Sequence, residues 1–182
     1  MAETRDRALD AAVRVVGDQG VRALTHGRVD AEAGLPKGST SNWFRTRDAL
    51  LSGVLVWIAE QERAELTAAM APAHTPDEVA DALCGMLESA TGLNATRTRA
   101  RYALFLEVTA APGILPVMRT QRGLFEEWTR DRLADLGAPD PESSARTLLA
   151  LCAGLIVNRL TVAPDMPVRE SIDLALRGAL AG

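Results

Sequence analysis

The side chains best suited to chemistry in this chain gather in one short stretch, residues 25–47. Up to residue 44 it reads THGRVDAEAGLPKGSTSNWF, and arginines follow at positions 45 and 47. Hydroxyls, amides and positive charges of this kind hydrogen-bond to phosphate oxygens and to base-pair edges. Two short helices around a turn at Gly34 fit the pattern, which is typical of a helix-turn-helix. The stretch therefore predicts contact with DNA.

Covalent or metal chemistry has little support in the rest of the sequence. His26 and His74 lie far apart, and neither has an acidic-histidine pattern around it, so no zinc site is expected. Residues 34–40 resemble a phosphate-binding loop only superficially, because the G-x-x-x-x-G-K-[ST] spacing is absent. Glu126 and Glu127 are adjacent and so lie on different faces of a helix. We expect no enzyme, no cofactor and no metal.

The stretch must be positioned by helices, and the N-terminal sequence predicts them. A first helix is expected over residues 4–18, where four apolar residues form one stripe: Leu9, Ala12, Val13 and Val16. Thr25 is a suitable N-cap for the second helix. Pro36 suits the first position of a third helix, residues 36–42, because its missing N–H costs nothing there. Thr46 caps a long fourth helix.

The remaining sequence also predicts helices, which makes the expected fold all-α. Thr75, Pro76 and Glu78 form a capping box after a proline-containing break. Further breaks are expected at Pro112-Gly113 and Pro116. The predicted helices span approximately residues 76–92, 95–110, 117–136, 141–162 and 167–180, and Asp140 is the expected N-cap of the helix over 141–162.

The distribution of charge favours a protein that meets nucleic acid with one end only. The 182 residues carry a net charge of −4, which argues against a non-specific coat on nucleic acid. Residues 22–47 hold five basic and two acidic side chains, so this window is +3 while the other residues are −7. A basic patch on an acidic chain fits local phosphate contact; chance clustering on a solvated face is the alternative.

One predicted helix carries an unusually apolar segment, residues 148–157. A helix that is apolar on all sides must be covered on all sides. It either passes through the centre of its own domain or packs against a second copy of the chain. Small side chains at positions 150, 153 and 154 permit close approach, and we favour the contact between two copies.

Cysteine usage and the N-terminus predict a cytoplasmic location. Cys84 and Cys152 both lie in apolar helical patterns, so we expect buried thiols in a reducing compartment and no disulfide. The first residues are charged and include no apolar segment of the kind that signal peptides contain. The longest apolar run is too short to span a bilayer.

With these elements placed, the N-terminal third of the chain resembles the tetracycline repressor (TetR) family. The resemblance rests on residues at fixed spacing: Gly20, Leu24-Thr25, Val29, Ala33-Gly34-Leu35, Lys37-Gly38-Ser39, Phe44, Arg47 and Ala49-Leu50-Leu51. Membership implies a DNA-binding head, expected here over residues 1–50, and a helical ligand-binding and dimerisation domain over residues 51–182. It also implies a homodimer that binds a double-stranded operator, mostly as a repressor that a small effector releases.

The resemblance assigns roles residue by residue. Thr25 caps the second helix and touches a phosphate, Trp43 packs on the sugar-phosphate backbone, and Arg47 contacts a phosphate where the family usually has Lys. Phosphates are also expected to meet backbone N–H groups at helix starts. The complete set of expected DNA contacts is Thr25, Arg28, Lys37, Gly38, Ser39, Thr40, Ser41, Asn42, Trp43, Arg45 and Arg47. Base choice is expected to fall to Lys37, Ser39, Thr40 and Asn42.

Three residues depart from the family pattern. Asp30 stands where Ala is usual, so its carboxylate must find solvent or a partner such as Arg28 or Lys37. Ser41 replaces a common Tyr and removes one expected backbone contact. Asn42 stands where His or Tyr is common, and Asn can pair with adenine. These departures leave the DNA-reading role intact but prevent any operator sequence from being transferred.

Aromatic and polar side chains of the C-terminal region suggest a site for a small, mostly apolar effector. The candidates are Met86, Tyr102, Phe105, Trp128 and Asn158, and Glu107 is a further orienting group. Each also suits an ordinary core position at helical spacing. The alternative function is a helical protein-interaction adaptor with a degenerate DNA-binding head, for which Asp30 and Ser41 are the best arguments.

Overall fold

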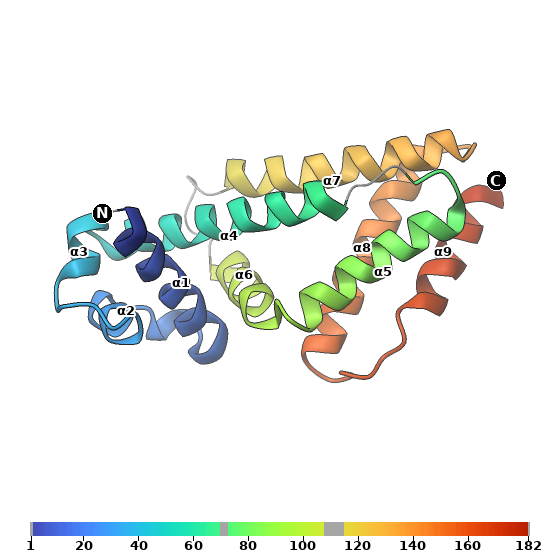
Figure 1. Ribbon diagram of the computed structural model, residues 1–182. Coiled ribbons are helices and arrows are strands. Elements are labelled where there is room, and N and C mark those ends of the chain that lie inside the picture. The colour runs from blue at the N-terminus through green and yellow to red at the C-terminus, as the bar shows by residue number, and fades with distance from the viewer. Residues whose placement is uncertain (1, 70–72, 108–114, 182) are drawn as a thin grey trace. The chain divides into compact units, whose positions relative to one another are not determined.

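A computed structural model describes residues 2–69, 73–107 and 115–181, and these residues fold into helices joined by turns (Figure 1). The all-α fold class is confirmed. The elements are α1 (Ala2–Gln19), the 3-10 helix η1 (Val21–Ala23), α2 (His26–Glu32), α3 (Ser39–Trp43), α4 (Arg47–Ala69), α5 (Pro76–Thr91), α6 (Ala95–Glu107), α7 (Leu115–Asp135), α8 (Pro141–Leu160) and α9 (Arg169–Ala181).

Most helix boundaries follow the predicted caps. Thr46 accepts a hydrogen bond from the Ala49 N–H at the start of α4 (3.1 Å), and Asp140 accepts one from the Ser143 N–H at the start of α8 (3.0 Å). The capping box at the start of α5 is also present. Pro116 lies inside the first turn of α7, where a helix does not need its N–H, so a break there was wrongly predicted. The expected break at residues 112–113 lies outside the described residues.

The chain divides into two compact units. The first contains Met1–Glu62 and Asn94–Arg119, and the second contains Arg63–Leu93 and Thr120–Gly182. The packing units therefore do not follow the expected boundary at residue 50, because α6 packs in the same unit as α1. A functional boundary at that residue stays a prediction.

The first unit is built on the apolar stripe of α1. All four residues of that stripe are buried, and the core around them contains Leu24, Val29, Phe44, Leu50, Val54, Leu55, Ile58, Ala100 and Leu104. Helix α6 approaches α1 at Gly17, where an added Cβ would lie 2.2 Å from the carbonyl oxygen of Thr96. The Thr96 hydroxyl also donates a hydrogen bond to Asp18 (3.1 Å). A glycine is thus what allows the two backbones to come this close.

The second unit buries one face each of α5, α8 and α9. Its core includes Leu83, Leu87, Trp128, Leu133, Leu148, Cys152, Leu155, Ile172 and Leu176. Arg169 at the start of α9 binds three carboxylates, with 2.7 Å to Asp173, 3.2 Å to Asp77 and a further contact to Asp81. The pairs with Asp77 and Asp81 link α9 to α5 at the surface, where each contributes little to stability.

Helix α8 is not covered on all sides within its own unit. Leu148, Leu149, Cys152 and Leu155 are buried, while Ala150, Gly154 and Val157 are exposed. The second unit alone thus leaves one side of this apolar helix in contact with solvent.

Both cysteines are free and buried, as predicted. Burial raises the pKa of the Cys152 thiol to about 12, and it also raises the pKa of Cys84. Both thiols are therefore protonated at neutral pH.

We expect Gly17→Ala to destabilise the protein by about 1–3 kcal/mol, because a methyl group there overlaps backbone atoms of Thr96. Gly27→Ala is the matched control in the same unit, since nothing lies within 4 Å of its added Cβ. That change should be neutral or stabilising by up to about 1 kcal/mol. Urea unfolding of the two variants measures both effects. Equal stabilities would contradict the packing described for α1 and α6.

Candidate nucleic-acid interface

Two glycines shape the chain between α2 and α3. The Thr25 hydroxyl accepts a hydrogen bond from the Arg28 N–H (3.3 Å) and caps α2, as predicted. Gly34 then adopts a φ of 62° and Gly38 a φ of 93°, a region that disfavours any residue with a Cβ. These conformations bend the chain twice, so that α3 follows α2 as a separate short helix.

The third helix is shorter than predicted. It begins at Ser39 and ends at Trp43, whereas the sequence suggested residues 36–42. Pro36 instead belongs to a turn, because its carbonyl accepts hydrogen bonds from the Ser39 N–H (3.1 Å) and the Ser39 hydroxyl (2.6 Å). The left-handed Gly38 cannot be part of an α-helix, so the helix starts only after it.

Most side chains that the sequence assigned to DNA are exposed to solvent. The exposed ones are Thr25, Arg28, Lys37, Ser41, Asn42, Trp43, Arg45 and Arg47. Gly38 and Ser39 are partly buried. Ser41, Asn42 and Arg45 line one shallow surface depression. The part of α3 after residue 40 is thus available for contact with a ligand as large as a duplex.

Thr40 is an exception, and its expected exposure was wrong. It is completely buried, and its hydroxyl donates a hydrogen bond to Oδ1 of Asp30 (2.5 Å). A buried and bonded hydroxyl cannot reach a base pair. The sequence misled here because Thr at the start of a polar helix resembles its exposed neighbours.

Asp30 lies beneath α3 and binds it through both carboxylate oxygens. Oδ1 also accepts from the Thr40 N–H (2.8 Å), Oδ2 accepts from the Gly38 N–H (2.7 Å), and the residue is 3% exposed. The partners expected from the sequence, Arg28 and Lys37, were therefore wrong. Burial by itself would raise the pKa of Asp30, but the bonds from Thr40 and Gly38 outweigh it and hold the pKa below its ordinary value.

The backbone N–H groups at the start of α3 are already used inside the protein. Those of Gly38 and Thr40 bind Asp30, and that of Ser39 binds the Pro36 carbonyl. These bonds disfavour phosphate contact through the N–H groups of Gly38, Ser39 and Thr40, and the expectation for other N–H groups at helix starts stays a prediction. The Ser39 and Ser41 hydroxyls donate to the carbonyls of Pro36 and Gly38, but their lone pairs can still accept hydrogen bonds.

Several side chains to which the sequence assigned no structural role fix α2 and α3 in place. Nε2 of His26 lies 2.6 Å from the Phe44 carbonyl, which joins the start of α2 to the end of α3. From α1, Arg7 donates to the Ala33 carbonyl (2.9 Å), and Arg14 pairs with Glu32 (2.9 Å). No sequence motif signals these contacts, because they join residues separated by 18 to 26 positions.

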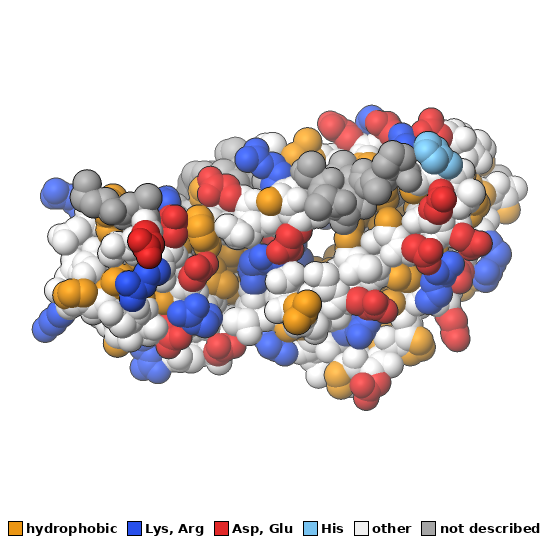
Figure 2. Space-filling view, in the orientation of Figure 1, with side chains coloured by type: hydrophobic (Ala, Val, Ile, Leu, Met, Phe, Trp, Pro, Cys, Tyr) orange, Lys and Arg blue, Asp and Glu red, His pale blue; other side chains and the backbone are white. Residues whose placement is uncertain are grey.

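The arginines expected at phosphates are partly held by the protein itself. Arg47 donates to the Val21 carbonyl (3.0 Å), and Arg28 donates to the side chain of Gln19. Each guanidinium carries five N–H donors, so further donors remain for a phosphate. Figure 2 shows acidic and basic side chains interspersed on the face in view, without a large area of one sign.

The five expected effector residues divide between the two units. Tyr102 and Phe105 belong to the first unit, with ring centroids 6.0 Å apart, and Met86, Trp128 and Asn158 belong to the second. Trp128 is buried against Phe125, and the Asn158 amide donates to the Gly154 carbonyl (2.9 Å). Their joint role in one site stays a prediction. The side chain of Glu107 lies outside the described residues.

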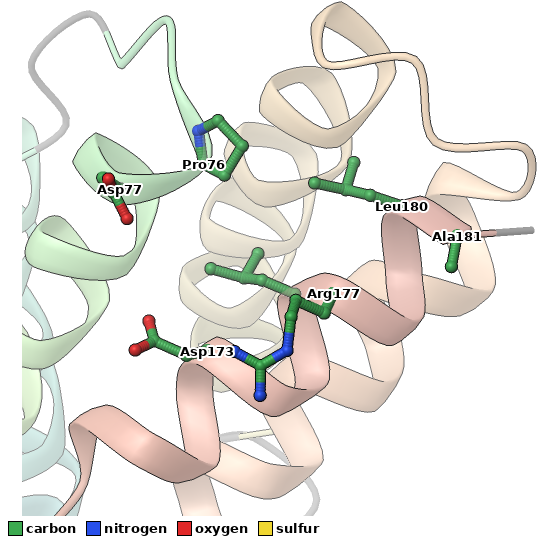
Figure 3. Close-up of a pocket in the computed structure, with 7 residues that line it drawn as sticks. Pro76, Asp77, Asp173, Arg177, Leu180 and Ala181 are labelled. Carbon is green, nitrogen blue, oxygen red and sulfur yellow. The ribbon is translucent and has the colours of Figure 1, made fainter.

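A surface pocket of about 560 Å³ lies between α5 and α9 in the second unit (Figure 3). Its lining combines apolar and charged side chains: Pro76, Asp77, Asp173, Leu176, Arg177, Leu180 and Ala181. None of the expected effector residues belongs to it. The two carboxylates of this lining, Asp77 and Asp173, are both paired with Arg169.

Other kinds of site find little support in the structure. Across residues 2–69, 73–107 and 115–181, no group of three His, Cys, Asp or Glu side chains is arranged to hold a metal ion. No helix in the described part of the chain is both long and apolar enough to cross a membrane.

A short exposed helix held on a second helix through a glycine-containing turn, within an all-α fold, defines a helix-turn-helix protein. A family model described as "Tetracyclin repressor-like, C-terminal domain" matches residues 74–182. The chain belongs to the TetR family of DNA-binding transcriptional regulators.

Individual relatives agree with this assignment. The HTH-type transcriptional regulator BetI of Rhizobium meliloti is 36% identical over 84 residues, which span 46% of this chain but only 41% of that protein. The multidrug binding protein EbrR, solved with imidazole, is 31% identical, with 99% of this chain and 91% of that one covered and a TM-score of 0.67. A TetR family member from Streptomyces coelicolor A3 is also 31% identical, with 98% of each chain covered and a TM-score of 0.69.

The lowered pKa of Asp30 predicts how this residue affects stability as the pH changes. A carboxyl group with a folded pKa below its unfolded value of about 3.9 stabilises the protein above that pH, and the contribution disappears as the pH falls through the folded pKa. We expect Asp30→Asn to cost about 1–3 kcal/mol at pH 7 and at pH 5. The difference from wild type should shrink at pH 3. Urea unfolding at the three pH values measures it, and a constant difference would contradict the bonding of Asp30.

Proposed function

We propose that the protein is a sequence-specific repressor that binds a palindromic operator as a homodimer and leaves it when a small effector binds. One observation carries the proposal: α2, α3 and the start of α4 expose polar and cationic side chains together, on a chain whose other residues are net acidic. Family membership supports DNA binding and regulation. The repressor action, the dimer and the release by effector are our inference.

In this mechanism α3 enters the major groove and presents its exposed end to base edges. Base reading falls to side chains on and just before α3, namely Lys37, Ser39, Ser41 and Asn42. Phosphate contact falls to Thr25, Arg28, Arg45 and Arg47, and Trp43 packs on the sugar-phosphate backbone. Gly38 only shapes the turn, and Thr40 has no direct contact with the duplex. Two copies span half-sites about 34 Å apart, or a multiple of that distance.

Selection of binding sites from random duplexes by the purified protein tests this function. A palindromic consensus is the expected result, because a twofold dimer presents two identical α3 helices. Affinity for that consensus should fall by about 10⁴-fold, and by at least about 10³-fold, between 50 and 200 mM salt if the dimer makes roughly eight phosphate contacts. Failure to enrich any sequence would refute the proposal.

Two substitutions separate base reading from phosphate binding. Arg47→Ala should weaken binding to the selected site and to a scrambled duplex by the same factor, because a phosphate carries no sequence information. Asn42→Ala should also reduce the preference at one base pair, by about 1–3 kcal/mol. Titrations on both duplexes measure these effects.

Arg130→Ala is the control for lost charge, since Arg130 lies in the second unit and pairs with its neighbour Asp131. It should leave both affinities unchanged. Equal losses on both duplexes for Asn42→Ala would remove Asn42 from the set of base readers.

The proposed dimer uses the sides of α8 and α9 that face solvent. On α8 the exposed positions are Ala150, Gly154 and Val157, and on α9 they are Leu174, Gly178 and Ala181. Both sets follow the same i, i+4, i+7 spacing, which places each set on one face of its helix. Val157 is 43% exposed and Leu174 is 66% exposed. A second copy would cover these apolar groups.

We therefore expect Val157→Glu and Leu174→Glu to convert the dimer to a monomer, because each places a charge in an apolar contact. Sedimentation equilibrium measures the change, and operator affinity should fall with it. Val162→Glu is the matched control, because Val162 lies beyond the end of α8 and is 82% exposed. A wild-type protein that is monomeric at micromolar concentration would contradict the proposed dimer.

The proposed effector is a small, largely apolar molecule, and the rings of Tyr102 and Phe105 suggest an aromatic cation among the candidates. The guanidinium of Arg101 already lies over both rings, 5.1 and 5.9 Å from their centroids, and pairs with Glu62 (2.9 Å). Ring faces attract cations of this kind. EbrR was solved with ethidium as well as with imidazole. Ethidium is thus the first compound to titrate against the protein–operator complex.

The adaptor alternative has lost one of its two arguments. It relied on Asp30 and Ser41 as signs of a degenerate DNA-binding head. Asp30 supports α3 directly, so its carboxylate is not a defect of the head. An adaptor would bind no duplex in the selection described above.

A further inference from the structure

We propose that Asp30 is a positioning residue for sequence recognition: it sets the orientation of α3 and thereby determines how well the protein distinguishes one DNA sequence from another. The inference rests on the proposed DNA-reading function. It concerns a residue that does not touch the duplex and that the family pattern fills with Ala.

Helix α3 cannot hold its position by itself. It has five residues, and isolated helices of such length are unstable in water. Its N-cap residue, Gly38, has no side chain to bind the free N–H groups. Within α3, Thr40 alone is buried, so the contact between α3 and the layer beneath it runs through this residue. The group that meets Thr40 there is the carboxylate of Asp30.

Asp30 fixes the path of the chain at three points. Its backbone carbonyl accepts from the Leu35 N–H (2.8 Å) at the beginning of the turn. Its Oδ2 binds the Gly38 N–H at the end of the turn, and its Oδ1 binds the N–H and hydroxyl of Thr40 in the first turn of the helix. Two oxygens that bind donors two residues apart restrict both the distance and the rotation of α3.

A buried carboxylate orients a helix more strictly than an apolar contact does. Apolar contact is not directional, so a helix seated on it can rotate slightly at low cost. Charge-assisted hydrogen bonds are short and directional, and three of them also offset the cost of removing the charge from water. Asp30 in place of Ala thus favours a single orientation of α3.

This orientation matters more for base reading than for contact with the DNA backbone, to which α3 itself contributes only Trp43. Ser41 and Asn42 directly follow Thr40, so a rotation at Thr40 moves the side chains that face the bases. Hydrogen bonds to base edges require placement to within about 0.5 Å. Arg28 and Arg47 lie on α2 and α4 and do not depend on α3 for their position. Loss of the Asp30 contacts should therefore reduce discrimination between sequences while leaving non-specific binding in place.

The test compares dissociation constants for the selected site and for a scrambled duplex. In Asp30→Asn an amide N–H₂ replaces the oxygen that faces the Gly38 N–H, and in Thr40→Val the hydroxyl is lost. Asp30→Asn should lower the ratio of specific to non-specific affinity about tenfold or more, and Thr40→Val less. Affinity for the scrambled duplex should stay equal or rise, because Asp30→Asn removes a negative charge near the DNA. The salt dependence should not change.

Two controls accompany these variants. Thr40→Ser keeps the hydroxyl and should retain the wild-type ratio. Glu60→Gln removes the same charge from the first unit, where Glu60 is exposed on α4, and should also retain the ratio. Thermal unfolding of every variant ensures that the titrations are made on folded protein.

If Asp30 has a purely structural role, its replacement should lower the affinities for the selected site and the scrambled duplex by the same factor. That result would overturn the inference. An unchanged ratio of specific to non-specific affinity in both variants would also overturn it. If Asp30→Asn does not fold, the ratio of specific to non-specific affinity measured for Thr40→Val tests the inference instead. If the wild-type protein and both variants prefer the selected site over the scrambled duplex to the same degree, only this inference is overturned. Wild-type protein that binds no duplex overturns the proposed function, and the inference falls with it.

Discussion

A helix of five residues has too few internal hydrogen bonds to persist in water, so α3 takes its shape from what lies beneath it. That support is the carboxylate of Asp30, which is removed from solvent and surrounded by donors from Gly38 and Thr40. The surrounding contacts have the same effect. His26 reaches the far end of α3 through the Phe44 carbonyl, and Arg7 holds the end of α2. The exposed side chains of α3 are thus positioned by buried and partly buried polar groups that are hydrogen-bonded to one another.

The two units are both built from helices, but their helices pack differently. The first packs α1, the two short helices, α4 and α6 around one apolar core, and Gly17 lets α6 lie very near α1. The second packs α5, α8 and α9 more conventionally and leaves apolar groups such as Val157 and Leu174 in contact with water. We propose that the first arrangement serves recognition of DNA and that the second serves self-association.

Sequence reasoning found nearly every helix because the signals that define a helix are local. Thr25, Thr46 and Asp140 cap the helices that they were expected to cap, and the α1 stripe is buried as its spacing required. The bounds of the short third helix were wrong because the spacing of apolar residues does not reveal the left-handed conformation of Gly38. The exposure of Thr40 and the partner of Asp30 were misjudged because both depend on a contact across ten residues. The expected effector residues belong to both units, which no local pattern reveals.

The two cysteines have a consequence for the kind of signal to which this protein responds. Thiolates, and not thiols, react with peroxides and electrophiles, and a thiol with a pKa of about 12 yields almost no thiolate at cellular pH. Cys84 and Cys152 are the only cysteines in the chain, and both lie in the interior of the second unit. Burial therefore makes both thiols poor targets for oxidants and electrophiles at cellular pH.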